Sequence, residues 1–177
     1  MAYTVAGAIS STLVGFLLGA VGAVIGWTGA ARIALYVVAL LSLILAAREW
    51  GWIKFRLPEQ KLQTEKVWVH DFGFVWASAM WGLHIGLGFA TRITYGGFWL
   101  LVAAILALGN PAFGAVLMLS YWIGRALPVW LAPLLLSSDE VLDSTEAVFD
   151  HGYVYHRLVG IGLAWSAGLT ILLAASA

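Results

Sequence analysis

The sequence contains no cysteine. Without a thiol, the chain has no disulfide, no thiolate metal site and no centre for thiol–disulfide exchange. Charged residues are also scarce, at 10% of the 177 residues, against about 25% in a typical soluble domain. Nine basic residues balance nine acidic ones, so the composition does not indicate a nucleic-acid-binding surface. The composition therefore argues against thiol chemistry and against nucleic acid as a partner.

Hydrophobic residues make up 62% of the chain, and its mean hydropathy is +0.93. The few charges are bunched, and the runs between them approach the roughly 20 apolar residues that cross a bilayer as a helix. We therefore predict an all-α, polytopic integral membrane protein, a six-helix transmembrane bundle that forms a single domain. The N-terminal run lacks a preceding basic region, so we expect a retained helix and not a signal peptide. The expected spans are residues 5–27, 33–47, 71–90, 98–108, 111–136 and 153–174.

The fifth of these spans carries a charge at depth. Arg125 lies inside it, just after Tyr121 and Gly124 and just before Pro128. A charge there costs roughly 2.5–3.5 kcal/mol on insertion scales, so something must compensate it. Pro128 lacks a backbone donor and frees a carbonyl in the preceding turn. No Asp or Glu lies deep in any expected span, which leaves such carbonyls, Tyr121, water or a lipid phosphate as partners. We predict that this group has a structural role, or that it contacts lipid or a partner subunit: Tyr121, Gly124, Arg125 and Pro128.

The distribution of charge predicts an orientation. Residues 48–70 contain five Lys or Arg and are flanked by Trp, a pattern typical of a cytoplasmic loop. Residues 137–150 contain five acidic residues and no basic one, which suits the opposite side. Six alternating spans then place both termini in the cytoplasm, with Arg92 and Arg157 as exceptions on the outer side. A bacterial inner membrane is the expected location.

Glycine is abundant in the first span, where Gly15, Gly19, Gly22 and Gly26 lie near one face. Small residues on a stripe allow two helix backbones to approach closely in lipid. We predict tight packing of this helix, with a flexible gating helix as the alternative.

Two histidines are candidates for cofactor binding. His84 lies inside the third span and His156 near the start of the sixth. Neutral imidazole is a common axial ligand of haem iron. The two depths, about 10 and 6 Å from the outer ends at 1.5 Å per residue, are close enough for one bis-histidine haem b site. The alternative is that each histidine packs or donates a hydrogen bond.

The segment LVAAILALGNPAFGAVLMLSYWIGRALPVWLAPLL resembles the closing half of the CcdA/DsbD transmembrane family, which moves reducing equivalents across membranes. Its matching features are a helix break at Gly109-Asn110-Pro111 and the pattern Y-x-x-G-x-x-L-P from Tyr121 to Pro128. The resemblance implies that family's fold and a position beside redox partners. The family's Cys-Pro elements have no counterpart, and residues 75–81 stand where one of them is expected. The resemblance therefore does not imply the reaction.

These observations lead to one functional prediction with two alternatives. We predict a non-catalytic structural or accessory subunit of a larger electron-transfer or photosynthetic membrane complex, with no catalytic residue and no metal site. Its partners are membrane lipids and other membrane-protein subunits. One alternative is a haem b-binding electron carrier that uses His84 and His156. The other is a small transporter with a midplane site at the helix breaks of Pro111 and Pro128.

Overall fold

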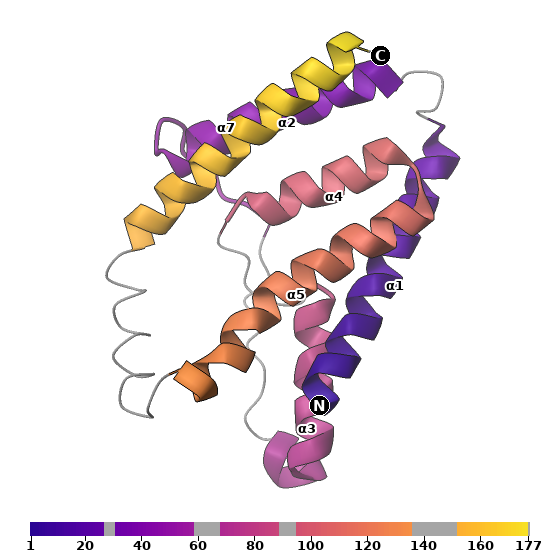
Figure 1. Ribbon diagram of the computed structural model, residues 1–177, viewed down its shortest axis with the longest axis vertical. Coiled ribbons are helices and arrows are strands. Elements are labelled where there is room, and N and C mark those ends of the chain that lie inside the picture. Colours follow the sequence, from indigo (N-terminus) through magenta and orange to yellow (C-terminus); the bar gives the residue numbers. More distant parts are fainter. Residues whose placement is uncertain (27–30, 59–67, 89–94, 136–151, 177) are drawn as a thin grey trace.

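The computed structural model describes residues 1–26, 31–58, 68–88, 95–135 and 152–176, and the regular structure in these ranges is helical throughout (Figure 1). The all-α fold is confirmed, and six helices lie where the six apolar runs predict them. The acidic segment 137–150 lies outside the described residues. The helices are α1 (Ala2–Ile25), α2 (Ala31–Glu49), α3 (Trp68–Gly86), α4 (Gly97–Leu108), α5 (Pro111–Leu135) and α7 (Gly152–Ser176).

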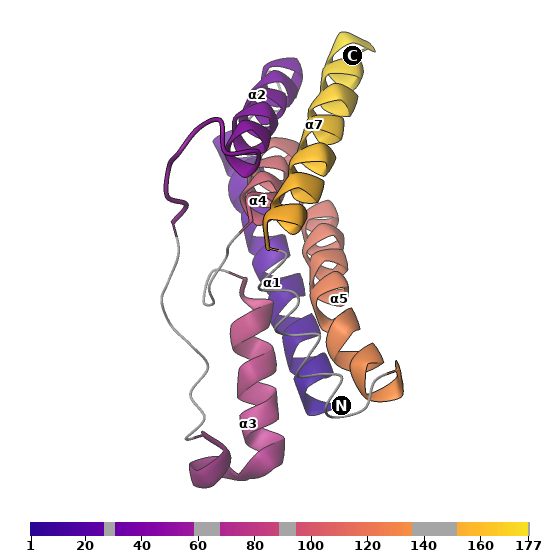
Figure 2. The same ribbon diagram turned by 90° about the vertical axis from the view of Figure 1, so that its left-hand side faces the viewer.

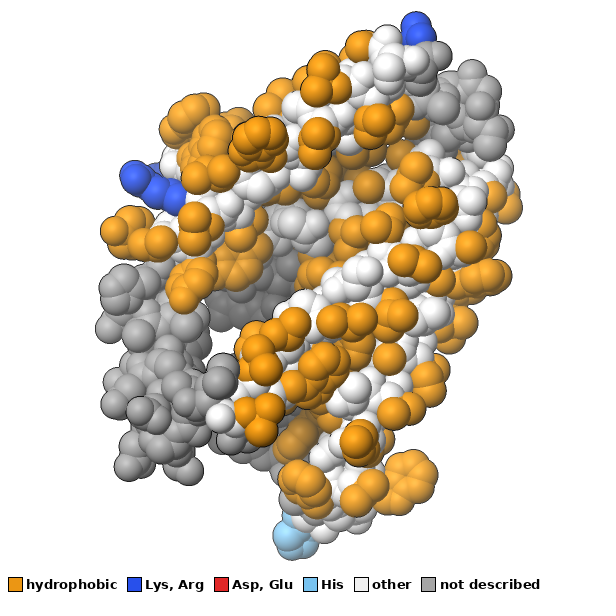
Figure 3. Space-filling view, viewed as in Figure 1, with side chains coloured by type: hydrophobic (Ala, Val, Ile, Leu, Met, Phe, Trp, Pro, Cys, Tyr) orange, Lys and Arg blue, Asp and Glu red, His pale blue; other side chains and the backbone are white. Residues whose placement is uncertain are grey.

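Three of these helices are long and apolar enough to cross a membrane. They are α1, residues 111–131 of α5, and α7, whereas α4 has 12 residues. Large hydrophobic side chains cover the outside of the helices, as the orange surface in Figure 3 shows. Water would penalise such a surface, whereas lipid tails solvate it. The chain is therefore a membrane protein, and the crossings by the other helices stay predictions.

Helices α1 and α5 pack backbone to backbone. A Cβ atom added at Gly15 would lie 2.7 Å from Met118 Cβ, and one added at Gly19 would lie 2.7 Å from Pro111 Cα. Both distances are far shorter than ordinary contact, so only glycine fits at these positions. The tight-packing prediction is confirmed for this part of the stripe. Gly26 plays another role, because its φ of 75° ends α1 in the left-handed conformation that glycine adopts freely.

The glycine contacts also fix the directions of three helices. Antiparallel α1 and α5 are joined by a hydrogen bond from Trp130 Nε1 to Thr4 Oγ1 (3.0 Å). Gly82 of α3 contacts the backbone of Tyr3, and Gly86, one turn later, contacts that of Gly7. Helix α3 therefore runs parallel to α1.

Helix α4 folds back on α5 through the turn at residues 109–110. The Phe98 ring near the start of α4 lies 5.4 Å from that of Tyr121 in the middle of α5. Because α4 is antiparallel to α5, and α5 to α1, α4 also runs parallel to α1. Consecutive helices α3 and α4 thus point the same way, which alternating spans do not allow.

Helices α2 and α7 form a second antiparallel pair, side by side in both ribbon views (Figures 1 and 2). Ser42 Oγ of α2 donates to the carbonyl oxygen of Leu163 in α7 (2.6 Å). At one end of the pair, Glu49 contacts His156, and its side chain also reaches Gly96 at the start of α4. The end of α2 and the beginnings of α4 and α7 therefore lie together. Six alternating crossings would put the end of α2 opposite the other two, so this contact conflicts with the alternation that places both termini in the cytoplasm.

Helix α3 differs from the expected straight span of residues 71–90. Gly73 has φ 76° and ψ 164°, so the chain bends sharply there and the long helical part follows the bend. The helix ends at Gly86, and Gly88, with φ 75°, lies against the Phe98 ring. Glycine tolerates such positive φ values at no steric cost. The third apolar run is therefore shorter as a helix than its hydropathy suggests.

Candidate functional site

The most enclosed charged group among the described residues is the carboxylate of Glu49, at the last residue of α2. Its side chain has 0% relative exposure. Oε1 accepts from Arg48 Nη1 (2.6 Å) and from the backbone N–H of Gly96 (2.8 Å). Oε2 pairs with His156 Nδ1. No Asp or Glu lies deep in an expected span, yet Glu49, which follows the expected span 33–47, is buried in the bundle.

The carboxylate is stable at this depth because each of its oxygens is paired. A buried charge is tolerated only when charge-assisted hydrogen bonds replace its water shell. The cluster of Arg48, Glu49, Gly96 and His156, here called the Glu49 junction, joins α2 to the beginnings of α4 and α7. The Tyr95 ring lies 4.8 Å from that of His156 and covers one side. A carboxylate paired with one ring nitrogen also fixes the orientation of the imidazole.

Sequence reasoning missed Glu49 because its partners are distant in the chain. His156 lies 107 residues away in the chain. Gly96 contributes only a backbone N–H, and no sequence pattern predicts that such a group will bind a carboxylate. Arg48-Glu49 therefore indicated nothing more than the end of a span. One signal was available: Glu49 is the first acidic residue of the chain and lies two residues after the end of an apolar run.

Of the sequence-predicted site residues, the structure brings Tyr121 and Arg125 together. Arg125 Nη1 donates to Tyr121 Oη over 3.5 Å, and the guanidinium lies 5.8 Å from the centre of the ring. The first distance is long for a hydrogen bond and the second is typical of a cation–π contact. Gly124 faces open space. Helix α5 continues through Pro128 as far as Leu135.

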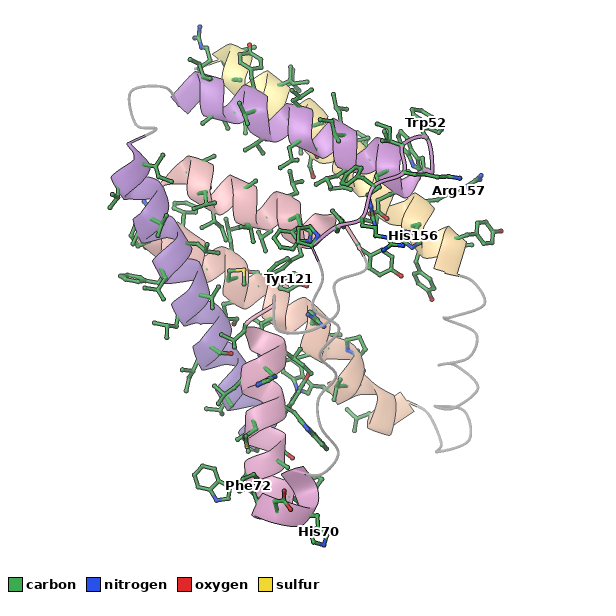
Figure 4. All side chains as sticks on the ribbon, turned by 180° about the vertical axis from the view of Figure 1, so that it is seen from behind. Trp52, His70, Phe72, Tyr121, His156 and Arg157 are labelled. Carbon is green, nitrogen blue, oxygen red and sulfur yellow. The ribbon has the colours of Figure 1, made fainter. Side chains whose placement is uncertain are left out.

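The two candidate haem ligands lie on helices with different neighbours. His84 belongs to α3, which packs against α1, whereas His156 belongs to α7, which packs against α2. Figure 4 shows His156 at the beginning of α7, where Glu49 holds its Nδ1. The haem site stays a prediction. Among the described residues, no group of three or more His, Cys, Asp or Glu side chains is arranged to hold a metal ion.

The contact between Arg125 and Tyr121 leads to a prediction. Replacing Tyr121 by Phe removes the long hydrogen bond and keeps the aromatic ring under the guanidinium. We expect the free energy of unfolding in mild detergent to fall by less than about 1 kcal/mol. Replacing Tyr121 by Leu removes the ring as well, and we expect a larger loss. Thermal unfolding followed by circular dichroism measures both, and equal losses would show that the ring does not hold Arg125.

An open pocket of about 740 Å³ adjoins the Glu49 junction. One wall of the pocket is the segment that follows α2. This segment turns at Gly51 (φ 79°) and folds back, so that Leu57 is buried against α2 and α7. Arg48 Nε holds this segment by donating to the carbonyl oxygen of Phe55 (3.1 Å). The charged and histidine side chains that line the pocket are Arg48, Glu49, Lys54, Arg56, His156 and Arg157.

Comparison with known proteins finds relatives with one shared name. The chain is 28% identical over 123 residues to the methylamine utilization protein MauF of Paracoccus versutus. It is 25% identical over 121 residues to MauF of Paracoccus denitrificans and 24% over 122 residues to MauF of Methylorubrum extorquens. The matches cover 68–69% of this chain and 43–45% of the relatives, so the chain spans less than half of their length. Neither a protein-family model nor a solved structure matches it.

These relatives overturn the resemblance to the CcdA/DsbD transmembrane family. The curated proteins that align with the chain are named MauF, and the family interpretation is wrong. Its physical basis was weak, because a Gly-Asn-Pro break followed by Y-x-x-G-x-x-L-P is built from residues common in transmembrane helices. Glycine and proline positions report on helix packing, which unrelated membrane bundles share.

Proposed function

We propose that the chain is a non-catalytic membrane accessory protein in methylamine utilisation. The observation that carries the proposal is its likeness to three MauF proteins over more than two thirds of its length. The relatives come from bacteria, which is consistent with a place in a bacterial cytoplasmic membrane. Other membrane-protein subunits of the same pathway are its proposed partners.

The Glu49 junction supports a structural role. Its carboxylate is engaged by Arg48, Gly96 and His156, so its hydrogen bonds hold helices together. A catalytic acid or base needs hydrogen-bond reach to a substrate proton. Glu49 is enclosed and already paired, which favours an accessory role.

Deleting the gene from its source organism tests the proposal. We expect growth on methylamine to be lost and growth on a non-amine substrate with ammonium to continue, with rescue by a plasmid-borne copy. Accumulation of radiolabelled methylamine in the same cells separates an accessory protein from a transporter. Uptake should stay at the wild-type level, and its loss would favour the transporter. Normal growth on methylamine would reject the proposed pathway.

The directions of the helices lead to a prediction about the membrane orientation. Because α3 and α4 run the same way, we expect them to count as one crossing, so that the N- and C-termini lie on opposite sides. The two ends of the chain also lie at opposite ends of the molecule (Figures 1 and 2). Arg157, an exception under six alternating spans, then joins Arg48, Lys54 and Arg56 on one side. That side is cytoplasmic by the distribution of positive charge.

The absence of cysteine makes this orientation easy to test, because single-cysteine variants have no background. An impermeant maleimide applied to intact cells should label Ser176→Cys. It should label Ala2→Cys and Lys54→Cys only after the membrane is permeabilised. Equal labelling of Ala2→Cys and Ser176→Cys in intact cells would place both on the same side of the membrane and would indicate an even number of crossings.

A further inference from the structure

The pocket beside the Glu49 junction is rich in positive charge. Four of its lining residues are cations, Arg48, Lys54, Arg56 and Arg157, and one, Glu49, is an anion. The Glu49 carboxylate is occupied by Arg48, Gly96 and His156. Lys54, Arg56 and Arg157 are exposed and direct their charge to the pocket and its mouth. The lining therefore carries an excess of positive charge over the one carboxylate it contains.

The surroundings of these cations are those of a membrane interface. The rings of Trp50 and Trp52 lie 4.9 Å apart at a tilt of 55° beside the pocket, and the Arg157 guanidinium lies 6.0 Å from the centre of the Tyr153 ring. Figure 4 shows Trp52, His156 and Arg157 together at the α2–α7 end, and Figure 3 shows basic side chains there among hydrophobic ones. Trp and Tyr prefer the level of the lipid headgroups. The cations therefore lie where headgroup phosphates lie.

The rim of the pocket is apolar and open to the membrane. Ile53 and Tyr153, which line the pocket, are exposed, Tyr153 to 66%. Next to lining residues in the chain, Leu158 and Trp52 are also exposed, Trp52 to 75%. A free phosphate ion would need only the cations. A phospholipid would use the cations for its phosphate and the apolar rim for the first part of its acyl chains.

We propose that this pocket binds the phosphate headgroup of an anionic phospholipid. Arg56 and Arg157 hold the phosphate through guanidinium groups, whose planar forks match its oxygens. Lys54 adds a third charge, and Arg48 stays with Glu49 and the Phe55 carbonyl. Bound there, the lipid bridges the segment after α2 to the first turn of α7. This site is independent of the pathway proposed above.

Native mass spectrometry of the purified full-length chain in mild detergent tests the site. Phosphatidylglycerol and phosphatidylcholine with identical acyl chains are titrated separately, so that only the headgroup differs. We expect phosphatidylglycerol to bind at least tenfold more tightly. In the double variant R56Q/R157Q its dissociation constant should rise about 30-fold, from about fivefold for each cation near a membrane surface. Equal affinity of the two lipids would overturn the proposal.

Arg32 provides the matched control. It is an exposed arginine at the beginning of α2, the end away from the pocket. R32Q should leave the phosphatidylglycerol affinity within twofold of the parent chain, and an equal loss in R32Q would mean that net charge alone attracts the lipid. Because Arg56 and Arg157 are exposed, the double variant should keep the parent's circular dichroism spectrum, and K54Q gives a second reading at about fivefold if it does not. Inorganic phosphate at millimolar concentration distinguishes the sources: displacement of the lipid by phosphate would assign the site to a free anion and reject the lipid.

Discussion

Replacing Glu49 by Ala is expected to lower the free energy of unfolding by about 3–5 kcal/mol, the range found when one member of a buried ion pair is removed. The carboxylate accepts from Arg48, from the Gly96 N–H and from His156, and it has no exposed surface. Alanine would remove one acceptor from the partly buried Arg48 guanidinium, which keeps the Phe55 carbonyl, and would take the carboxylate from a buried N–H and an imidazole. Thermal unfolding in mild detergent measures the loss.

The exposed pair of His70 and Asp71 is the matched control. It also pairs a histidine with a carboxylate, here that of an aspartate at 3.5 Å, but the side chains are 93% and 48% exposed. Exposed pairs contribute about 0–1 kcal/mol, so Asp71→Ala should change stability little. Similar losses for Glu49→Ala and Asp71→Ala would show that the burial of Glu49 has no energetic consequence.

A double-mutant cycle then separates the ion pair from the other contacts of Glu49. We expect Glu49→Ala and His156→Ala to be non-additive by more than about 0.5 kcal/mol, because the two side chains touch. Glu49→Gln keeps an oxygen for the Gly96 N–H and should cost less than Glu49→Ala. Additive effects would mean that Arg48 and Gly96 carry the junction without His156.

The helices could be predicted from the sequence because hydropathy is a local property. Each apolar run long enough for a helix forms one, and the breaks at Gly26 and Gly109 are local glycine effects with positive φ. The directions of the helices are not local. The hydropathy of a run does not depend on the direction of its helix, so the only available assumption was that consecutive spans alternate in direction. The parallel course of α3 and α4 contradicts that assumption.

The site was less predictable than the fold. Arg125 attracted attention because a charge inside an apolar run is visible in the sequence, and its contact with Tyr121 one turn earlier follows from helix geometry. Glu49 lies at the end of a run, where charges are ordinary. Its burial arises only when α4 and α7 pack around it, and the residues that do this lie 47 and 107 positions away.

Gly114→Ala should show the second large effect, and its direction opposes helix propensity. Alanine stabilises a helix interior by roughly 0.5–1 kcal/mol over glycine. At Gly114, however, the new methyl carbon would meet the carbonyl oxygen of Gly15 and lie 2.9 Å from Ile105 Cγ2. The carbonyl belongs to the α1 backbone and cannot rotate away, so α1 and α5 must separate. We expect a net loss of about 1–3 kcal/mol in thermal unfolding, the usual cost of overpacking.

Gly124 on the same helix is the control, since a Cβ added there meets nothing within 4 Å. Gly124→Ala should therefore show the propensity gain alone, with an increase of roughly 0.5–1 kcal/mol. The two variants make the same chemical change ten positions apart on α5, and they should shift the melting temperature in opposite directions. An increase for both would mean that α1 and α5 do not touch at Gly114. The contact at Gly114 is one of several between α1 and α5, together with Gly19 against Pro111 and Trp130 against Thr4, so that result would also weaken the basis for running α3 and α4 in the same direction.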